Sequence, residues 1–236
     1  MQKWFIIIYC CCISILFAKS DTNAGIEKRI QTLLDGMSLE EKIGQMSQIS
    51  MHATDIPDPI RDAVAAGRLG SVLNAGNLET KQELQKIAVQ ESPSGIPLIF
   101  GRDVIHGYQT VLPIPLGQSC SWNPDLIELG ARMAAAEASA NGVHWTFAPM
   151  IDITRDPRWG RIAETCGEDP YLTSVLARAM VRGFQSDNLS AADALAACAK
   201  HYVGYGAAIG GRDYNTTLIP ERQYAQYLSA VLSCCC

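Results

Sequence analysis

Apolar residues recur at helical spacing in several stretches of the chain, and polar start signals precede them. Ile26 to Leu34 has this spacing, and Ser38-Leu-Glu-Glu41 is a capping box that predicts a second helix running into Ile43 and Met46. Asn123 followed by Pro124 predicts a sharp helix start. The same signals predict helices over 61–66, about 79–90, 124–141, about 170–184, and from Pro220 onward.

Short apolar runs lie between these helices. They cover 69–73, 96–100 and 143–150, and a further apolar segment covers 195–203, so at most about five strands are expected. Strands that alternate with helices favour a parallel sheet, either a (β/α)8 barrel or a doubly wound sheet. No Gly-x-Gly-x-x-Gly motif follows a strand at a helix start, which argues against a dinucleotide-binding fold.

The first twenty residues have a different pattern from the rest. Lys3 leads into an apolar run from Trp4 to Phe17, and Ala18-Lys-Ser20 ends it in the small-x-small pattern of a secretory signal peptide. A membrane anchor is the alternative, but the run is short for a bilayer span. We therefore expect a signal peptide over 1–20, one domain over 21–236, and a secreted or periplasmic protein.

Composition and charge exclude several classes of function. The chain has 236 residues, of which 48% are hydrophobic and 18% charged, and its net charge is −5. Loss of Lys3 and Lys19 with a signal peptide makes it more acidic, so nucleic acid is not an expected partner. The cysteines and the four histidines have no zinc-ligand spacing, and we expect neither a metal nor a cofactor.

Polar residues gather where the predicted strands end. Asp103 follows the strand that ends at Phe100, residues 152–161 follow the strand that ends at Met150, and Lys200-His201 lie near the end of the segment around Ala197. In parallel α/β folds this carboxyl edge is where ligands bind. The sequence therefore predicts a polar pocket for hydroxyl-rich ligands.

Structural explanations compete with this one. Arg161 can form a purely structural ion pair with Asp156 or Glu164, because a buried charge must be paired. A single histidine on a strand is usually a core residue. Lys200 beside His201 changes that expectation, because neighbours on a strand point to opposite faces and both are polar.

Three segments in this order resemble the N-terminal barrel domain of glycoside hydrolase family 3. They read Gly-Arg-Asp-Val-Ile-His-Gly over 101–107, Phe-Ala-Pro-Met-Ile-Asp-Ile-Thr-Arg-Asp-Pro-Arg-Trp-Gly-Arg over 147–161, and Ala-Cys-Ala-Lys-His-Tyr-Val-Gly-Tyr over 197–205. The likeness extends from about Ile26 to Arg222 and is greatest to secreted bacterial β-glucosidases. It implies a (β/α)8 TIM-type barrel, incomplete in this chain, and a retaining exo-β-glucosidase that removes non-reducing terminal β-D-glucosyl residues from oligosaccharides or glucosides.

The resemblance also implies roles for individual residues. Asp103 matches a carboxylate that binds two hydroxyls of the terminal glucose, and Arg158, Lys200 and His201 match donors to the other hydroxyls. Arg161 is expected to pair with nearby acids, and Trp159 to pack beneath the loop rather than against the sugar. Tyr214 and Asn215 are expected near the site.

The family's nucleophile, an aspartate in an apolar-Ser-Asp context, has no match in this sequence, and no catalytic residue is assigned. The histidine pattern of the family's hexosaminidase branch is also missing, which favours the glucosidase branch, whose acid/base is a glutamate of a second domain. We therefore expect a fragment with the sugar-binding half of the site. A non-catalytic sugar-binding protein, a β-xylosidase and an unrelated secreted α/β protein remain as alternatives. The sequence does not indicate the aglycone preference or the oligomeric state.

Overall fold

The computed structural model describes residues 24–225 and 227. The predicted signal peptide over 1–20 lies outside these residues. Within them, every helix is too short or too polar to cross a bilayer.

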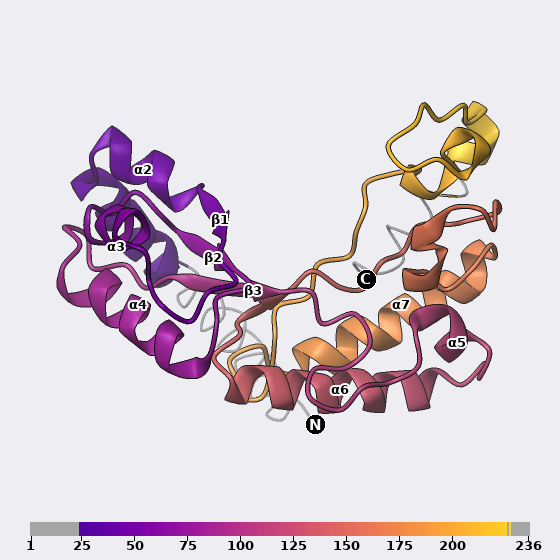
Figure 1. Ribbon diagram of the computed structural model, residues 1–236, viewed down its shortest axis with the longest axis horizontal. Coiled ribbons are helices and arrows are strands. Elements are labelled where there is room, and N and C mark those ends of the chain that lie inside the picture. Colours follow the sequence, from indigo (N-terminus) through magenta and orange to yellow (C-terminus); the bar gives the residue numbers. More distant parts are fainter. Residues whose placement is uncertain (1–23, 226, 228–236) are drawn as a thin grey trace, which may run out of the picture.

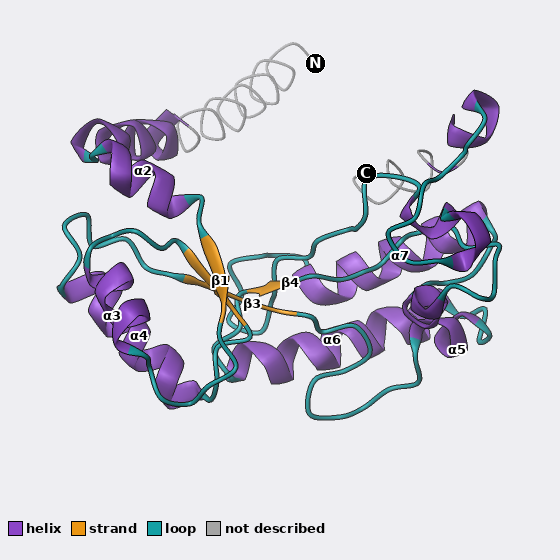
Figure 2. Cartoon of the chain, turned by 45° about the horizontal axis from the view of Figure 1, so that its top comes forward, coloured by secondary structure: helices purple, strands orange, loops and turns teal. Residues whose placement is uncertain are grey.

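The centre of the molecule is a sheet of four parallel strands (Figure 2). The strands are β1 (Gln48–Ser50), β2 (Ser71–Leu73), β3 (Ile99–Arg102) and β4 (Trp145–Thr146). Their order in the sheet is their order in the chain, with no reversal. A doubly wound sheet reverses its strand order at a switch point, whereas a barrel adds each strand beside the last. The topology is therefore that of part of a (β/α)8 barrel.

The sequence patterns misplaced some strand boundaries. β1 was not predicted, because its sequence Gln-Ile-Ser has a single apolar residue and gives no apolar run. Of the strand predicted over 143–150, only Trp145–Thr146 forms a continuous ladder, with β3, and Pro149 beyond it has no amide hydrogen to donate to a neighbouring strand. The segment over 195–203 forms isolated parallel bridges, Trp145 with Ala196 and Met150 with Lys200, instead of a strand. Four strands and this bridged segment account for the expected number of about five.

The predicted helices are present. Residues 24–36 and 221–225 are helical. The named helices are α2 (Leu39–Gln45), α3 (Asp58–Ala65), α4 (Leu78–Gln90), α5 (Pro115–Ser119), α6 (Pro124–Ala140) and α7 (Pro170–Gln185). Of these, α5 was not predicted. Ser38 forms the expected capping box with Glu41, and Asn123 caps α6 through its side chain.

Two hydrophobic clusters hold the sheet from different sides. One joins β1–β3 to α3 and α4 around Val72, Leu84 and Phe100. The other lies between α6 and α7, which run side by side in both views, around Ala135 and Leu176 (Figures 1 and 2). Burial of this apolar surface fixes the strand ends, and therefore fixes the polar residues that follow them.

Two loop regions complete the carboxyl edge. The first follows β4 and contains the 3-10 helix η1 (Gly160–Glu164), and the second contains η2 (Tyr205–Ala207) and η3 (Ile209–Gly211). A Cβ atom at Gly206 would lie 2.7 Å from Oγ1 of Thr154 and 2.9 Å from the carbonyl oxygen of Ile153. Glycine at this position lets the second loop pack directly against the first.

Candidate functional site

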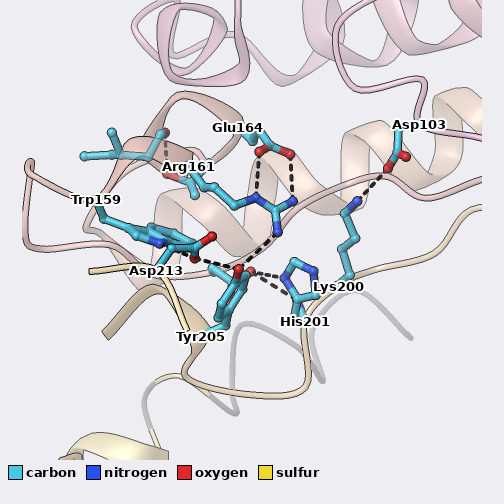
Figure 3. Close-up of polar contacts among 11 residues, drawn as sticks. Asp103, Trp159, Arg161, Glu164, Lys200, His201, Tyr205 and Asp213 are labelled. Atoms are coloured by element: carbon cyan, nitrogen blue, oxygen red, sulfur yellow. Dashed lines mark hydrogen bonds and ion pairs between the residues drawn. The ribbon is translucent and has the colours of Figure 1, made fainter. Parts of the chain in front are cut away.

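Asp103 and Lys200 meet at the carboxyl edge of the sheet, although 97 residues separate them (Figure 3). Asp103 directly follows β3, and Lys200 lies on the segment bridged to Met150. The Lys200 Nζ donates to Oδ1 of Asp103 over 2.7 Å. The Lys200 side chain is only 13% exposed and that of Asp103 is 44% exposed, so the carboxylate keeps a face open to solvent.

His201 is held by Asp152, which lies in the segment after β4. Oδ2 of Asp152 accepts from the backbone N–H of His201 over 3.2 Å and lies 2.7 Å from Nδ1 of its ring. The Asp152 side chain is fully buried, whereas His201 is one-third exposed. The imidazole is therefore anchored at one nitrogen and accessible elsewhere.

Arg161 and Glu164 form an ion pair beside this histidine. The Arg161 guanidinium donates to both oxygens of Glu164, over 2.7 and 2.9 Å. This contact holds the pKa of Glu164 below its ordinary value, and the hydrogen bonds that Arg161 donates to Glu164 raise the pKa of Arg161. Of the two partners considered for Arg161, the structure selects Glu164, and Arg161 holds the loop as expected.

Tyr205 links the two loops. Its hydroxyl donates to Oδ1 of Asp213 over 2.6 Å, and the same oxygen accepts from Nε1 of Trp159 over 2.9 Å. The Tyr205 ring meets those of Trp159 and His201 edge-on, with centroids 5.1 and 4.7 Å apart. Burial and the bond to Asp213 raise the pKa of Tyr205 to about 12, while the bonds from Tyr205 and Trp159 lower the pKa of Asp213. Figure 3 shows Tyr205 lying between Asp213 and His201.

Arg158 occupies a different environment. Its side chain is 71% exposed, and its guanidinium contacts Asp156, with 2.7 Å between Nη2 and Oδ2. The side-chain hydrogen bonds from Arg158 lower the pKa of Asp156 to about 2. Arg158 lines a cavity of about 420 Å³ between the two loops, together with Ile209 and Tyr227. The structure therefore brings Asp103, Lys200 and His201 to one edge, with Arg158 outside that cluster.

Other sequence predictions near the site have mixed outcomes. Trp159 is completely buried, so its expected packing role is confirmed. Tyr214 approaches the site, with its ring 5.7 Å from that of Tyr205. Asn215 instead donates to the carbonyl oxygen of Ile209 within its own loop.

Sequence signals are weaker for three residues that organise the site. Asp152 belongs to the polar stretch predicted at the end of β4, but nothing distinguished it from its neighbours. Tyr205 ends the third family-like segment, over 197–205, but no role is predicted for it. Asp213 follows no predicted strand. Each is positioned by contacts far along the chain, which periodicity does not reveal.

The arrangement favours binding of a neutral polyol. Carboxylate oxygens accept pairs of hydroxyl protons, the ammonium group donates to hydroxyl oxygens, and an imidazole nitrogen donates when protonated and accepts when not. Over residues 24–225 and 227, no group of three or more His, Cys, Asp or Glu side chains has the geometry of a metal site.

Comparison with known proteins gives a consistent family match. A model described as "Glycosyl hydrolase family 3 N terminal domain" matches residues 38–230. A periplasmic β-glucosidase of Salmonella typhimurium is 37% identical over 200 residues, covering 84% of this chain and 26% of the relative. A putative β-xylosidase of Formosa agariphila is 31% identical over 240 residues, covering 92% and 32%.

Solved structures agree with these relatives. The crystal structure of a β-glucosidase from Listeria innocua matches with a TM-score of 0.81 and 39% identity, covering 88% of this chain and 31% of that one. Structures of the same enzyme have been solved with glucose and isofagomine, and a mutant of it has been solved with laminaribiose. The chain spans about a quarter to a third of the length of the curated relatives it matches.

Proposed function

The chain belongs to glycoside hydrolase family 3, and on that premise we propose that it supplies the sugar-binding part of a retaining exo-β-glucosidase. The substrates are oligosaccharides or glucosides with a non-reducing terminal β-D-glucosyl residue. One observation carries the proposal: Asp103, Lys200 and His201, from two distant segments, converge at the carboxyl edge of the parallel strands. That edge is where barrel enzymes bind their substrates.

The residues at this edge bind different hydroxyl groups of the sugar in this proposal. Asp103 accepts protons from two neighbouring sugar hydroxyls, Lys200 donates to another, and His201 binds a further hydroxyl through its remaining ring nitrogen. Arg158 joins them by turning from Asp156 toward the ligand, which its exposure permits. A fixed set of charged donors and acceptors selects a sugar ring because charge-assisted hydrogen bonds are about twice as strong as neutral ones.

The relatives named above support a location outside the cytoplasm. The Salmonella relative is periplasmic by name, and so is a β-glucosidase/β-xylosidase of Dickeya chrysanthemi. We propose that residues 1–20 direct export of this protein.

A β-xylosidase is the second candidate. It is favoured by two relatives in Formosa agariphila, a β-xylosidase and a putative one, at 33% and 31% identity. Glucose and xylose share the ring hydroxyls that Asp103, Lys200 and His201 would bind, and they differ in the hydroxymethyl group. Calorimetric titration with both sugars separates the candidates, because a glucosidase site binds glucose more tightly.

The test of the proposal is titration of the 236-residue chain with isofagomine, the ligand of the Listeria enzyme, compared with the Asp103→Asn variant. Loss of one charged acceptor costs about 1.5–3 kcal/mol, which weakens binding about 10- to 100-fold. Asp187→Asn, at an exposed loop position, is the matched control and leaves binding unchanged. Equal affinities for the wild type and Asp103→Asn would contradict the proposal.

Turnover is a separate measurement. No aspartate of this sequence stands in the apolar-Ser-Asp context of the family's nucleophile. We therefore expect the pure chain to bind isofagomine without releasing p-nitrophenol from p-nitrophenyl β-glucoside. Measurable release would show that this chain carries the catalytic groups as well.

A further inference from the structure

The contacts of the buried Asp152 carboxylate come from His201. Oδ2 receives both the backbone N–H and the ring Nδ1 of His201. Oδ1 is buried and has no hydrogen-bond partner among the residues that the structure describes. Burying a carboxylate costs free energy unless the group is paired and hydrogen-bonded. The buried position of Asp152 therefore depends on its two contacts with His201.

The backbone holds the two residues at this spacing. The N–H of Ile151 donates to the carbonyl oxygen of Lys200 over 2.6 Å, and the N–H of Lys200 donates to that of Pro149 over 3.0 Å. These bonds lie on either side of a parallel bridge between Met150 and Lys200. Asp152 and His201 each follow this bridge by a short stretch of chain, so their separation is fixed by main-chain contacts.

The remaining surroundings leave one ring nitrogen for a ligand. The Tyr205 ring packs edge-on against the imidazole. Charged neighbours are Lys200 on the same segment and the Glu164–Arg161 pair on η1. A carboxylate can only accept, so Nδ1 carries the proton in the contact with Asp152.

We propose that Asp152 is a positioning residue for His201, which fixes the ring and its tautomer so that Nε2, which then carries no proton, accepts from a sugar hydroxyl. The orientation of the ring follows from the geometry alone, whereas the role toward a sugar rests on the proposed function. The partner of a histidine's second nitrogen commonly sets which nitrogen is available, as in the ligands of metal sites.

The chain contains internal references for a direct test. His106 Nδ1 lies 3.0 Å from the carbonyl oxygen of Leu112, which requires a proton on Nδ1. His144 Nδ1 accepts from the backbone N–H of Phe100 over 3.1 Å, which requires the opposite tautomer. Long-range proton–nitrogen spectra of the labelled full chain, at a pH where the rings are neutral, distinguish these two patterns. His201 is assigned by the signals missing from His201→Ala.

We expect the neutral His201 ring to show the His106 pattern, with the proton on Nδ1. In Asp152→Ala the ring should become a mixture of tautomers, while Asp152→Asn restores the Nδ1–H form, because the amide oxygen still accepts. A His144-like pattern in the wild type would overturn the proposal, and this test remains available if Asp152→Ala does not fold.

Isofagomine binding then tests the link to the site. Asp152→Ala and His201→Ala should each weaken binding about tenfold, and the double variant should bind no more weakly than His201→Ala, because Asp152 acts through His201. If the loss of affinity in the double variant equals the product of the losses in the two single variants, the positioning role is overturned. If the wild type binds no isofagomine, the proposed function fails, and the tautomer measurement still decides whether Asp152 positions the ring.

Discussion

Two ion pairs at the carboxyl edge are similar in chemistry and different in how they are held. Lys200 and Asp103 are 97 residues apart, and Lys200 is mostly buried on a segment bonded to its neighbours on the edge. Arg158 and Asp156 are two residues apart, and Arg158 is 71% exposed. Both have a shortest nitrogen–oxygen distance of 2.7 Å.

The difference shows which part of the site is fixed before a ligand arrives. The fold imposes the first pair, because separating it requires moving a segment anchored in the sheet. Local geometry imposes the second, and an exposed arginine can leave its partner at little cost. We infer a rigid base formed by Asp103, Lys200 and His201, and a movable Arg158 above it.

The largest expected effect concerns the buried anchor of the Arg158 loop. Trp159→Ala removes a completely buried side chain and its bond to Asp213, which should lower the free energy of unfolding by about 3–5 kcal/mol. Chemical denaturation measures this change. Trp122→Ala, at a residue 74% exposed, is the control and should change stability by less than about 0.5 kcal/mol. Similar losses in both variants would mean that Trp159 does not anchor the loop.

Affinity for isofagomine separates the rigid pair from the movable one. Lys200→Met should weaken binding about 10- to 100-fold, since it removes a positioned charged donor. Arg158→Met should weaken it less than about tenfold, because Arg158 must first leave Asp156. Lys86→Met, on the exposed face of α4, is the control for loss of a positive charge. A greater loss of affinity in Arg158→Met than in Lys200→Met would contradict the distinction between a rigid pair and a movable one.

A smaller effect is the acid titration of Asp156. Its pKa is lowered from 3.8 to about 2 by Arg158, so the pair stabilises the fold above the ordinary carboxyl pKa and this contribution is lost as the pH falls through about 2. Carbon NMR of the labelled carboxyl group should show a midpoint near 2, moving up toward 3.8 in Arg158→Met. An unchanged midpoint would mean that Arg158 does not hold Asp156.

Much of the fold follows from local sequence signals. Ser38 and Asn123 predicted helix starts that the structure confirms, and the apolar runs before Asp103 and Asp152 placed those residues at strand ends. β1 escaped prediction because Ile49 is its only apolar residue, so no apolar run marks it. The predicted strand at 143–150 was too long because a run of apolar residues does not show where a ladder ends.

The sequence predicted the edge of the sheet at which the site lies, but not which residues contact each other there. Strand ends indicated that Asp103 and Lys200 lie at one rim, yet no pattern indicated their contact. Arg158 and His201 looked equivalent as donors, and only the tertiary structure shows that Asp152 holds one while Asp156 holds the other. Partners distant in sequence are set by packing, which a single sequence does not display.

The central claim is that a sugar binds at the edge formed by Asp103, Lys200 and His201, and amide shift mapping with isofagomine tests it most directly. The account predicts saturable shifts confined to residues 101–104, 150–162 and 198–214. It predicts none in the apolar groove between α5 and α6, which Leu112, Leu126 and Leu129 line. Shifts centred on that groove, or no shifts at saturating isofagomine, would contradict it.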